Sequence, residues 1–209
     1  MRKLRILLCC CLMMMPILAC ADSTPLAGYR ICIDPGHQAR LDDRQEPIAP
    51  GSTKTKMRAA GCAVGVRTHV RESVRNLEIA LKLRDALEQM GAEVLLTRDT
   101  EDVWVSNVQR AQMANQFRAD VYLRLHCNAH GNPRKRGICI YAPRRSAECL
   151  LGIAPAQMLA WSEAMADTLQ CATGAPSARA TTTNAYSGSN WALMPTFLIE
   201  MGYFSNVED

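Results

Sequence analysis

Two patterns of apolar and polar residues follow one another along most of the chain, from residue 29 onward. Short, nearly continuous apolar runs are typical of buried strands, and stretches with apolar residues three or four positions apart are typical of amphipathic helices. The apolar runs predict five strands, at residues 29–33, 93–97, 121–125, 137–141 and 196–199.

Three segments carry a helical pattern. One runs through Leu77 to Met90, and Gly91 is well placed to end it. A second begins after Ser106, because Gln109 three residues later completes a capping box, and it extends to about residue 117. The third covers about residues 154–173. Residues 38–71 and 174–189 contain many glycine, proline, serine and threonine residues, and we expect loops there.

This order of elements predicts a fold class. Strand and helix signals alternate, which favours a single three-layer αβα domain of the α/β class with a mostly parallel, twisted sheet. A chain of 209 residues is long enough for one such domain with a sizeable core.

The first 21 residues differ from the rest. Arg2, Lys3 and Arg5 form a basic head, and the apolar run 6–19 follows, which is the layout of a secretory signal. Residues 19–21 read A-C-A, a site whose cleavage would release a soluble chain starting at Asp22. Residues 17–20 also resemble a lipobox, in which Cys20 would become a lipid anchor. An uncleaved N-terminal anchor is a third alternative. Each alternative exports the domain 22–209 to the cell envelope or the extracellular space.

Charge and cysteine usage follow from this division. Without the signal, 21 basic and 20 acidic residues remain, so the sequence does not predict a nucleic-acid partner. The basic stretches at 134–136 and 144–145 are interpreted as solvated turns. Six cysteines remain, enough for up to three disulfides in an exported domain, with the pairing left open. They are Cys32, Cys62, Cys127, Cys139, Cys149 and Cys171.

Four side chains suited to metal chemistry fall at the ends of predicted elements. His37 follows the first strand, His126 follows the third and Glu200 closes the last, while Glu72 opens a helix. Sites in open α/β sheets are built at the carboxyl edge of the strands, so we expect all four on one rim. Taken singly, each has an ordinary explanation, such as a capping histidine or an acid in the first turn of a helix.

A catalytic zinc site needs three protein ligands, an open position for water and a base that takes the proton of that water. Two histidines and one carboxylate supply the ligands, and the second carboxylate supplies the base. Glu72 is our candidate ligand and Glu200 our candidate base, although position alone leaves the reverse assignment open. His69 is a rival ligand, because it would share a helical face with Glu72. Cys127 makes a poor catalytic dyad with His126, since neighbours on a strand point to opposite faces.

Five motifs, in order, resemble those of the zinc-dependent N-acetylmuramoyl-L-alanine amidases, the Amidase_3 family. The resemblance covers nearly the whole chain after the signal. The motifs are I-D-P-G-H at 33–37, E-S-V-R-N-L at 72–77, L-T-R-D at 96–99, L-H-C-N-A at 125–129 and F-L-I-E-M-G-Y-F-S-N at 197–206.

The resemblance implies a role for each matched residue. One zinc ion would be held by His37, Glu72 and His126, and Glu200 would be the catalytic base. The reaction implied is hydrolysis of the amide that joins N-acetylmuramic acid to L-alanine of the peptidoglycan stem peptide. Three further residues lie in stretches similar to the family's substrate side and are candidate substrate contacts: Asn128, Asn190 and Trp191.

The sequence departs from the family at its end. The family usually continues past the S-N motif with a further helix, whereas this chain stops at Asp209, so we expect the catalytic domain 22–209 to be short at its C-terminus. We expect a monomer. Two other functions are compatible with the pattern: a catalytically silent, envelope-anchored module that binds muropeptides, and a zinc peptidase that cuts within the stem peptide. The physiological role stays open.

Overall fold

The computed structural model describes residues 24–144 and 153–209. The expected signal segment, its Cys20 and the cysteine at position 149 lie outside these residues. No helix in the described ranges is long and apolar enough to cross a membrane.

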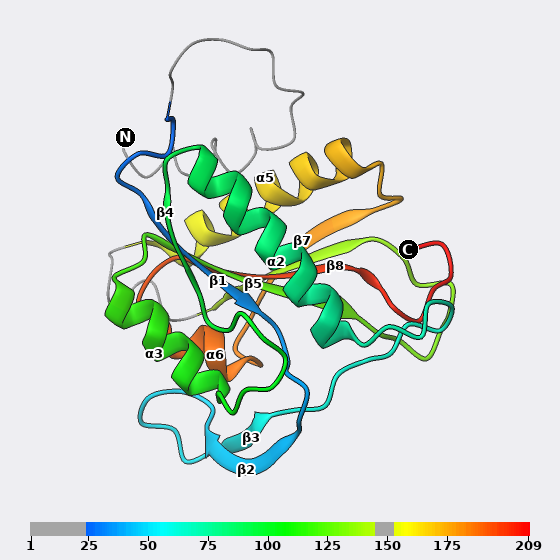
Figure 1. Cartoon of the computed structure of the whole chain (residues 1–209), viewed down its shortest axis with the longest axis horizontal. Coiled ribbons are helices and arrows are strands. Elements are labelled where there is room, and N and C mark those ends of the chain that lie inside the picture. The colour runs from blue at the N-terminus through cyan, green and yellow to red at the C-terminus, as the bar shows by residue number, and fades with distance from the viewer. Residues whose placement is uncertain (1–23, 145–152) are drawn as a thin grey trace.

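A six-stranded sheet forms the centre of the molecule (Figure 1). The strand order is β4 (Glu93–Leu96), β1 (Arg30–Pro35), β5 (Val121–Asn128), β8 (Thr196–Tyr203), β6 (Ile138–Pro143) and β7 (Ala178–Thr183). The first four strands are parallel to one another, while β6 is antiparallel to β8 and parallel to β7. The prediction of a mostly parallel sheet is confirmed. The amino ends of β6 and β7 therefore lie at the same edge as the carboxyl ends of the other four strands.

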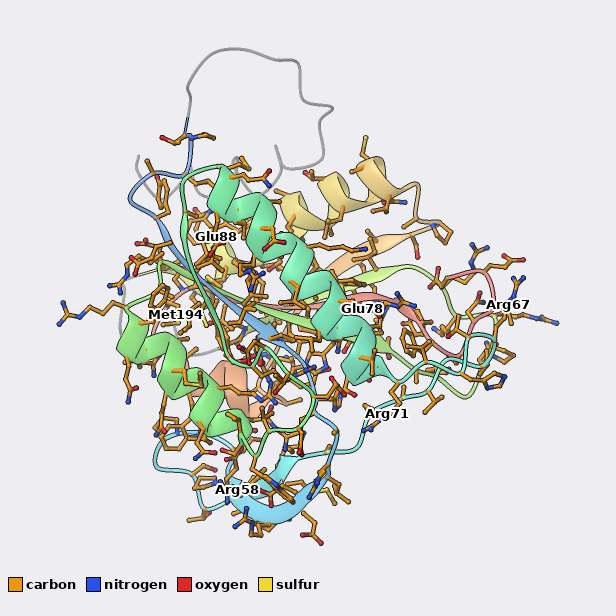
Figure 2. The ribbon with its side chains drawn as sticks, viewed as in Figure 1. Arg58, Arg67, Arg71, Glu78, Glu88 and Met194 are labelled. Carbon is orange, nitrogen blue, oxygen red and sulfur yellow. The ribbon has the colours of Figure 1, made fainter. Side chains whose placement is uncertain are left out.

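Helices cover both faces of the sheet, which confirms the three layers. α2 (Glu72–Gln89) and α5 (Pro155–Thr173) share one apolar core with the sheet. α3 (Asn107–Phe117) and the short α6 (Ser187–Asn190) lie on the opposite face around a smaller core. Figure 2 shows Glu78 and Glu88 on the outer side of α2, whose Ala80 and Leu87 are buried. The sequence pattern of α2 is thus amphipathic because one side of the helix packs on the sheet.

Two helix boundaries agree with the signals in the sequence. α2 ends before Gly91, which has a φ of 92° that a residue with a side chain rarely adopts. α3 begins after Ser106, whose side chain accepts from the backbone N–H of Gln109, while the Gln109 side chain accepts from the N–H of Ser106.

Two predicted loops contain regular structure, so this part of the prediction is wrong. Residues 38–71 hold an antiparallel hairpin of β2 (Asp42–Pro47) and β3 (Thr55–Ala59). Residues 174–189 hold β7 and the start of α6. The buried positions of β2 are the acids Asp42 and Glu46, so β2 shows no apolar alternation. In β7 the only apolar residues are two alanines, Ala178 and Ala180, which give too weak an apolar signal to predict a strand.

The described cysteines form no disulfide, in contrast to the pairing that six exported thiols suggest. Cys32, Cys127 and Cys139 are buried as free thiols, Cys62 is half-buried and Cys171 is exposed. The buried ones behave as small core residues.

Candidate active site

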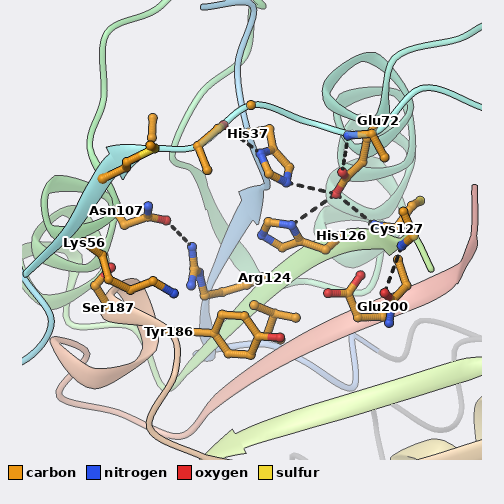
Figure 3. Close-up of a pocket in the computed structure, with 18 of the residues that line it drawn as sticks. His37, Lys56, Glu72, Asn107, Arg124, His126, Cys127, Tyr186, Ser187 and Glu200 are labelled. Atoms are coloured by element: carbon orange, nitrogen blue, oxygen red, sulfur yellow. Dashed lines mark hydrogen bonds and ion pairs between the residues drawn. The ribbon is translucent and has the colours of Figure 1, made fainter. Parts of the chain in front are cut away.

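The three predicted metal ligands converge at the carboxyl edge of the sheet. His37 follows β1, Glu72 is the first residue of α2 and His126 lies near the end of β5. Glu72 Oε1 is 3.2 Å from Nε2 of His37 and 3.2 Å from Nδ1 of His126 (Figure 3). The ligand atoms of all three side chains lie within 4.8 Å of one another.

The backbone around the triad is shaped to bring the two rings together. His37 has a φ of 61°, which is uncommon for a residue other than glycine. Its Nδ1 lies 3.1 Å from the carbonyl oxygen of Ala60, which leaves Nε2 directed at Glu72. Gly36 lies against the His126 ring, since a Cβ at this position would come within 2.3 Å of it. Glycine is therefore required here by space.

Glu72 is a buried carboxylate surrounded by donors. Oε1 accepts from the backbone N–H of Cys127 (3.0 Å) and from Nδ2 of Asn76 (3.3 Å), and Oε2 accepts from the N–H of Ala63 (3.2 Å). Burial by itself raises the pKa of Glu72, but hydrogen bonds from His126 and His37 outweigh it and hold this pKa well below its usual range. The side chain is therefore an anion.

The charge of Glu72 is not balanced by a lysine or arginine, since none forms an ion pair with it among the described residues. Burial lowers the pKa of His126 to about 4, so this ring is neutral at neutral pH. Neutral imidazole is the form that binds metals. A buried anion is costly without a counter-charge, so the donor set fits a bound cation.

Two of the three spacings between these donors also fit zinc, and the third is at most 4.8 Å. Two ligand atoms at about 2.0–2.1 Å from a tetrahedral zinc ion lie roughly 3.4 Å apart. The two separations of 3.2 Å around Glu72 Oε1 are close to this value. One carboxylate and two imidazoles are a ligand set typical of catalytic zinc sites.

Glu200 lies beside the triad on the neighbouring strand. Its Cα is the register partner of His126, and only 8% of the residue is exposed. Its Oε2 has no hydrogen-bond partner among the described residues. Burial, together with the negative charge of Glu72, raises the pKa of Glu200 to about 8. A buried carboxylate with a free oxygen is therefore available beside the candidate metal ligands.

The triad and Glu200 line one cavity of about 570 Å³ (Figure 3). The predicted substrate residue Asn128 lines it as well. No sequence signal pointed to four further lining residues, which come from β3, α3, β5 and the segment before α6: Lys56, Asn107, Arg124 and Tyr186.

Comparison with known proteins identifies the family. Residues 31–209 match the family described as N-acetylmuramoyl-L-alanine amidase, Amidase_3. The chain belongs to this family.

Individual relatives agree with this assignment. The N-acetylmuramoyl-L-alanine amidase Rv3717 of Mycobacterium tuberculosis is 32% identical over 207 residues, which cover 93% of this chain and 82% of the relative. The probable cell wall amidase LytH of Staphylococcus aureus is 27% identical, and the match spans only 52% of its length. The crystal structure of the amidase Ami1 from Mycobacterium smegmatis has the same fold, with a TM-score of 0.75 at 23% identity over 88% of this chain and 86% of that one.

In this amidase fold, β1, the strand that leads to His37, is anchored by a buried ionic cluster. Asp34 accepts from Nη1 of Arg110 (2.7 Å), Nε of Arg124 (2.9 Å) and Oγ1 of Thr97 (2.5 Å). Burial opposes ionisation, but the two guanidinium groups outweigh it and hold the pKa of Asp34 far below its ordinary value. Arg98 adds hydrogen bonds to the backbone carbonyl groups of residues 35, 36 and 73. These bonds tie β1 to the start of α2, and so His37 to Glu72.

Two of the predicted substrate residues, Asn190 and Trp191, do not line the cavity of the triad. Asn190 donates to the carbonyl oxygens of Ile48 and Asn184, both at 2.9 Å. Trp191 Nε1 donates to the carbonyl oxygen of Pro47 at 2.9 Å. Both side chains therefore attach the β2–β3 hairpin to α6.

The two remaining candidates from the sequence, His69 and Cys127, are not part of the triad. His69 is exposed. The Cys127 thiol points to α2, where Sγ is 3.6 Å from Oδ1 of Asn76, and burial raises its pKa. Cys127 is thus a buried neutral thiol, as the alternation along the strand suggested.

Proposed function

We propose that this chain is a zinc-dependent peptidoglycan amidase that hydrolyses the amide between N-acetylmuramic acid and L-alanine of the stem peptide. One observation carries the proposal: the buried anion Glu72 lies between His37 and His126, beside a Glu200 whose Oε2 has no partner in the described residues. The family and its named relatives support the choice of substrate.

His37, Glu72 and His126 would hold the zinc ion. When bound in such a site, zinc polarises the substrate carbonyl and lowers the pKa of water to about 7. The hydrogen bonds from Cys127 and Asn76 to Glu72 fix the carboxylate that would bind the ion. Supporting contacts of this kind typically decide metal affinity.

Glu200 would carry the proton through the reaction. Its free Oε2 accepts a proton from the attacking water as the water oxygen bonds to the carbonyl carbon. It then donates this proton to the alanine nitrogen as the carbon–nitrogen bond breaks, which leaves the lactate of muramic acid and a stem peptide with a free amine. A raised pKa near 8 suits both steps, because an acid–base group works best with a pKa near the operating pH.

We also propose that the domain acts outside the cytoplasm. The basic head and apolar run of residues 1–21 support export, either as a soluble protein or with a lipid on Cys20. The name of the cell wall amidase relative supports an envelope location for this chain. We propose a monomer as the active form.

Product analysis of digested peptidoglycan tests the activity. We expect intact stem peptides that begin with L-alanine, and glycan strands that keep the lactyl group. Peptides cut internally would contradict amidase action, and binding without any product would indicate a silent binding module. Removal of metal with a chelator should abolish product formation, and one equivalent of zinc should restore it.

The Glu200→Gln variant tests the proton carrier. We expect a loss of at least about 100-fold in turnover, because general acid–base groups contribute on the order of 10²–10⁴-fold. Metal content, measured by elemental analysis, should stay at one equivalent, since Glu200 is not among the three ligands. Wild-type turnover in this variant would overturn the assignment.

A further inference from the structure

A row of side chains crosses the sheet from the proposed base to an exposed arginine. Glu200 on β8 is the register partner of Cys139 on β6, and Cys139 is the partner of Arg179 on β7. Neighbouring strands lie about 4.8 Å apart, so two steps place the Cα atoms of Glu200 and Arg179 roughly 10 Å apart.

The three side chains of this row share one face of the sheet. Nε of Arg179 donates to Sγ of Cys139 at 3.3 Å, and its Nη2 donates to the hydroxyl of Tyr203 at 3.5 Å. These contacts hold the guanidinium group over β6, toward Glu200. Arg179 is exposed, and no acidic side chain pairs with it in residues 24–144 or 153–209.

A second cavity, of about 370 Å³, gathers further positive charge at the same edge. Arg179 lines it together with the turn 134–136 and Tyr203. Arg136 is neutralised by Glu208 and Asp209, but Arg134 and Lys135 are exposed and form no ion pair with a described residue. We name Arg134, Lys135 and Arg179 the basic cluster.

The two cavities adjoin. Asn128, which lines the cavity of the metal triad, is the register partner of Tyr203, which lines the cavity of the basic cluster. Both cavities open at one edge of the sheet because β6 and β7 run against the other strands. A ligand cleaved beside Glu200 can therefore extend over β6 to the basic cluster.

We propose that the basic cluster binds carboxylate groups of the stem peptide and so sets the direction in which the substrate lies. The proposal rests on the proposed amidase function. An extended peptide advances about 3.3–3.6 Å per residue, so 10 Å corresponds to about three residues beyond the cleaved amide. The terminal carboxylate of a stem peptide of three or four residues lies at that distance or about one residue beyond it. Guanidinium groups match carboxylates in geometry as well as in charge.

The balance of charge argues against a larger anion. After the signal, the chain carries nearly equal numbers of basic and acidic residues, and the cluster holds three cations. Binding to a nucleic acid or another polyanion typically uses more phosphate contacts than this. A few carboxylates on a short peptide fit the size of the cluster.

The test compares two synthetic muramoyl tetrapeptides that begin with L-alanine, one with free carboxyl groups and one with the same groups as primary amides. For the wild-type holoenzyme, we expect kcat/KM to be about 10-fold higher on the free acid, mainly through KM. In Arg179→Gln this preference should fall to about 2-fold, because kcat/KM on the free acid falls more than kcat/KM on the amide. Arg179→Lys should keep an intermediate preference.

The Lys82→Gln variant is the matched control, since Lys82 is an exposed lysine on α2 that forms no ion pair with a described residue. It removes the same charge and should keep the full preference. An Arg134→Gln/Lys135→Gln double variant should also reduce the preference. Equal kcat/KM of the wild type on both substrates, or a full preference in Arg179→Gln, would overturn the proposal. Cleavage of neither substrate by the wild type would instead contradict the amidase function.

Discussion

Two glutamates that line the same cavity acquire opposite properties from their surroundings. Glu72 receives hydrogen bonds from two rings and two backbone N–H groups, which keep its pKa low. Glu200 lies on β8, and one of its carboxylate oxygens has no hydrogen-bond partner among the described residues. Burial raises its pKa to about 8. Position in the sequence left the roles of the two acids interchangeable. Their environments support Glu72 as ligand and Glu200 as the proton carrier.

The raised pKa of Glu200 predicts a pH-dependent stability in the metal-free protein. The folded state keeps this proton up to about pH 8, whereas the unfolded chain releases it near pH 4.5. The stabilising contribution is therefore complete below pH 4.5 and is lost as the pH rises through 8. Between pH 5 and 8.5, we expect wild type to lose about 1–3 kcal/mol more unfolding free energy than Glu200→Gln. Urea unfolding of chelator-treated samples measures this difference, and equal losses would contradict the prediction.

Gly36 offers a second prediction at this scale. In Gly36→Ala, the new Cβ would lie within 2.3 Å of the His126 ring, so the ring must move from its place beside Glu72. We expect zinc affinity to fall about 10–100-fold, as for the loss of a contact that orients a ligand. Competition with a chromogenic chelator measures the affinity. Gly131→Ala is the control, because nothing lies within 4 Å of its Cβ. Equal affinities in the two variants would show that the ring does not depend on Gly36.

Among the elements, those with local signals could be predicted from the sequence. α2 ends before Gly91 and α3 begins after Ser106, as the sequence predicts, because helix capping depends on a few neighbouring residues. The β2–β3 hairpin could not be predicted. Its buried acids find partners far along the chain, as when Glu46 accepts from the backbone N–H of Val108 on α3. Asp42 and Glu46 are buried only because distant segments of the chain pack against them in the folded protein.

The attachment of this hairpin predicts the effect of one substitution at the end of α6. Trp191→Phe keeps an aromatic ring but removes the 2.9 Å hydrogen bond to Pro47, which contributes about 1 kcal/mol. We expect faster amide exchange in residues 42–59 and a roughly 5-fold lower kcat/KM at unchanged metal content, because β3 lines the catalytic cavity. Trp104→Phe is the control, since Trp104 is 53% exposed and lies outside that cavity. Unchanged exchange in Trp191→Phe would contradict a fastening role.

At the scale of the whole molecule, strand order assembles the site. His37 follows β1, His126 lies near the end of β5 and Glu200 lies within β8, and these three strands are adjacent in the sheet. The sequence predicted that these residues share a rim, but it did not contain the order of the strands. The reversed direction of β6 and β7 could not be predicted from the sequence either. The position of Arg179 near the rim, which depends on this direction, was therefore not predicted. These features depend on pairings between distant segments.

The Asp34 cluster joins three of these distant segments and predicts how the whole molecule responds to acid. Its carboxylate bonds Arg110 on α3 and Arg124 on β5, so its folded-state pKa is depressed. This contribution to stability is complete above the ordinary pKa near 4 and is lost as the pH falls below it. At pH 7, we expect Asp34→Asn to lower the unfolding free energy by about 3–5 kcal/mol, because two buried guanidinium groups lose their partner.

The loss of unfolding free energy in Asp34→Asn should become smaller as the pH falls from 5 toward 3. In that range the unfolded wild-type chain takes up a proton on this carboxyl, whereas the folded protein keeps the carboxyl charged. Urea unfolding at pH 7, 5 and 3, followed by circular dichroism, measures the deficit at each step. Asp85→Asn is the matched control, because Asp85 pairs with Arg84 at the surface and such pairs contribute at most about 1 kcal/mol. A deficit of equal size at pH 7 and pH 3 would mean that the substitution disturbs packing rather than charge. The cluster would then stabilise the layers through shape, and the acid sensitivity would have to arise elsewhere in the molecule.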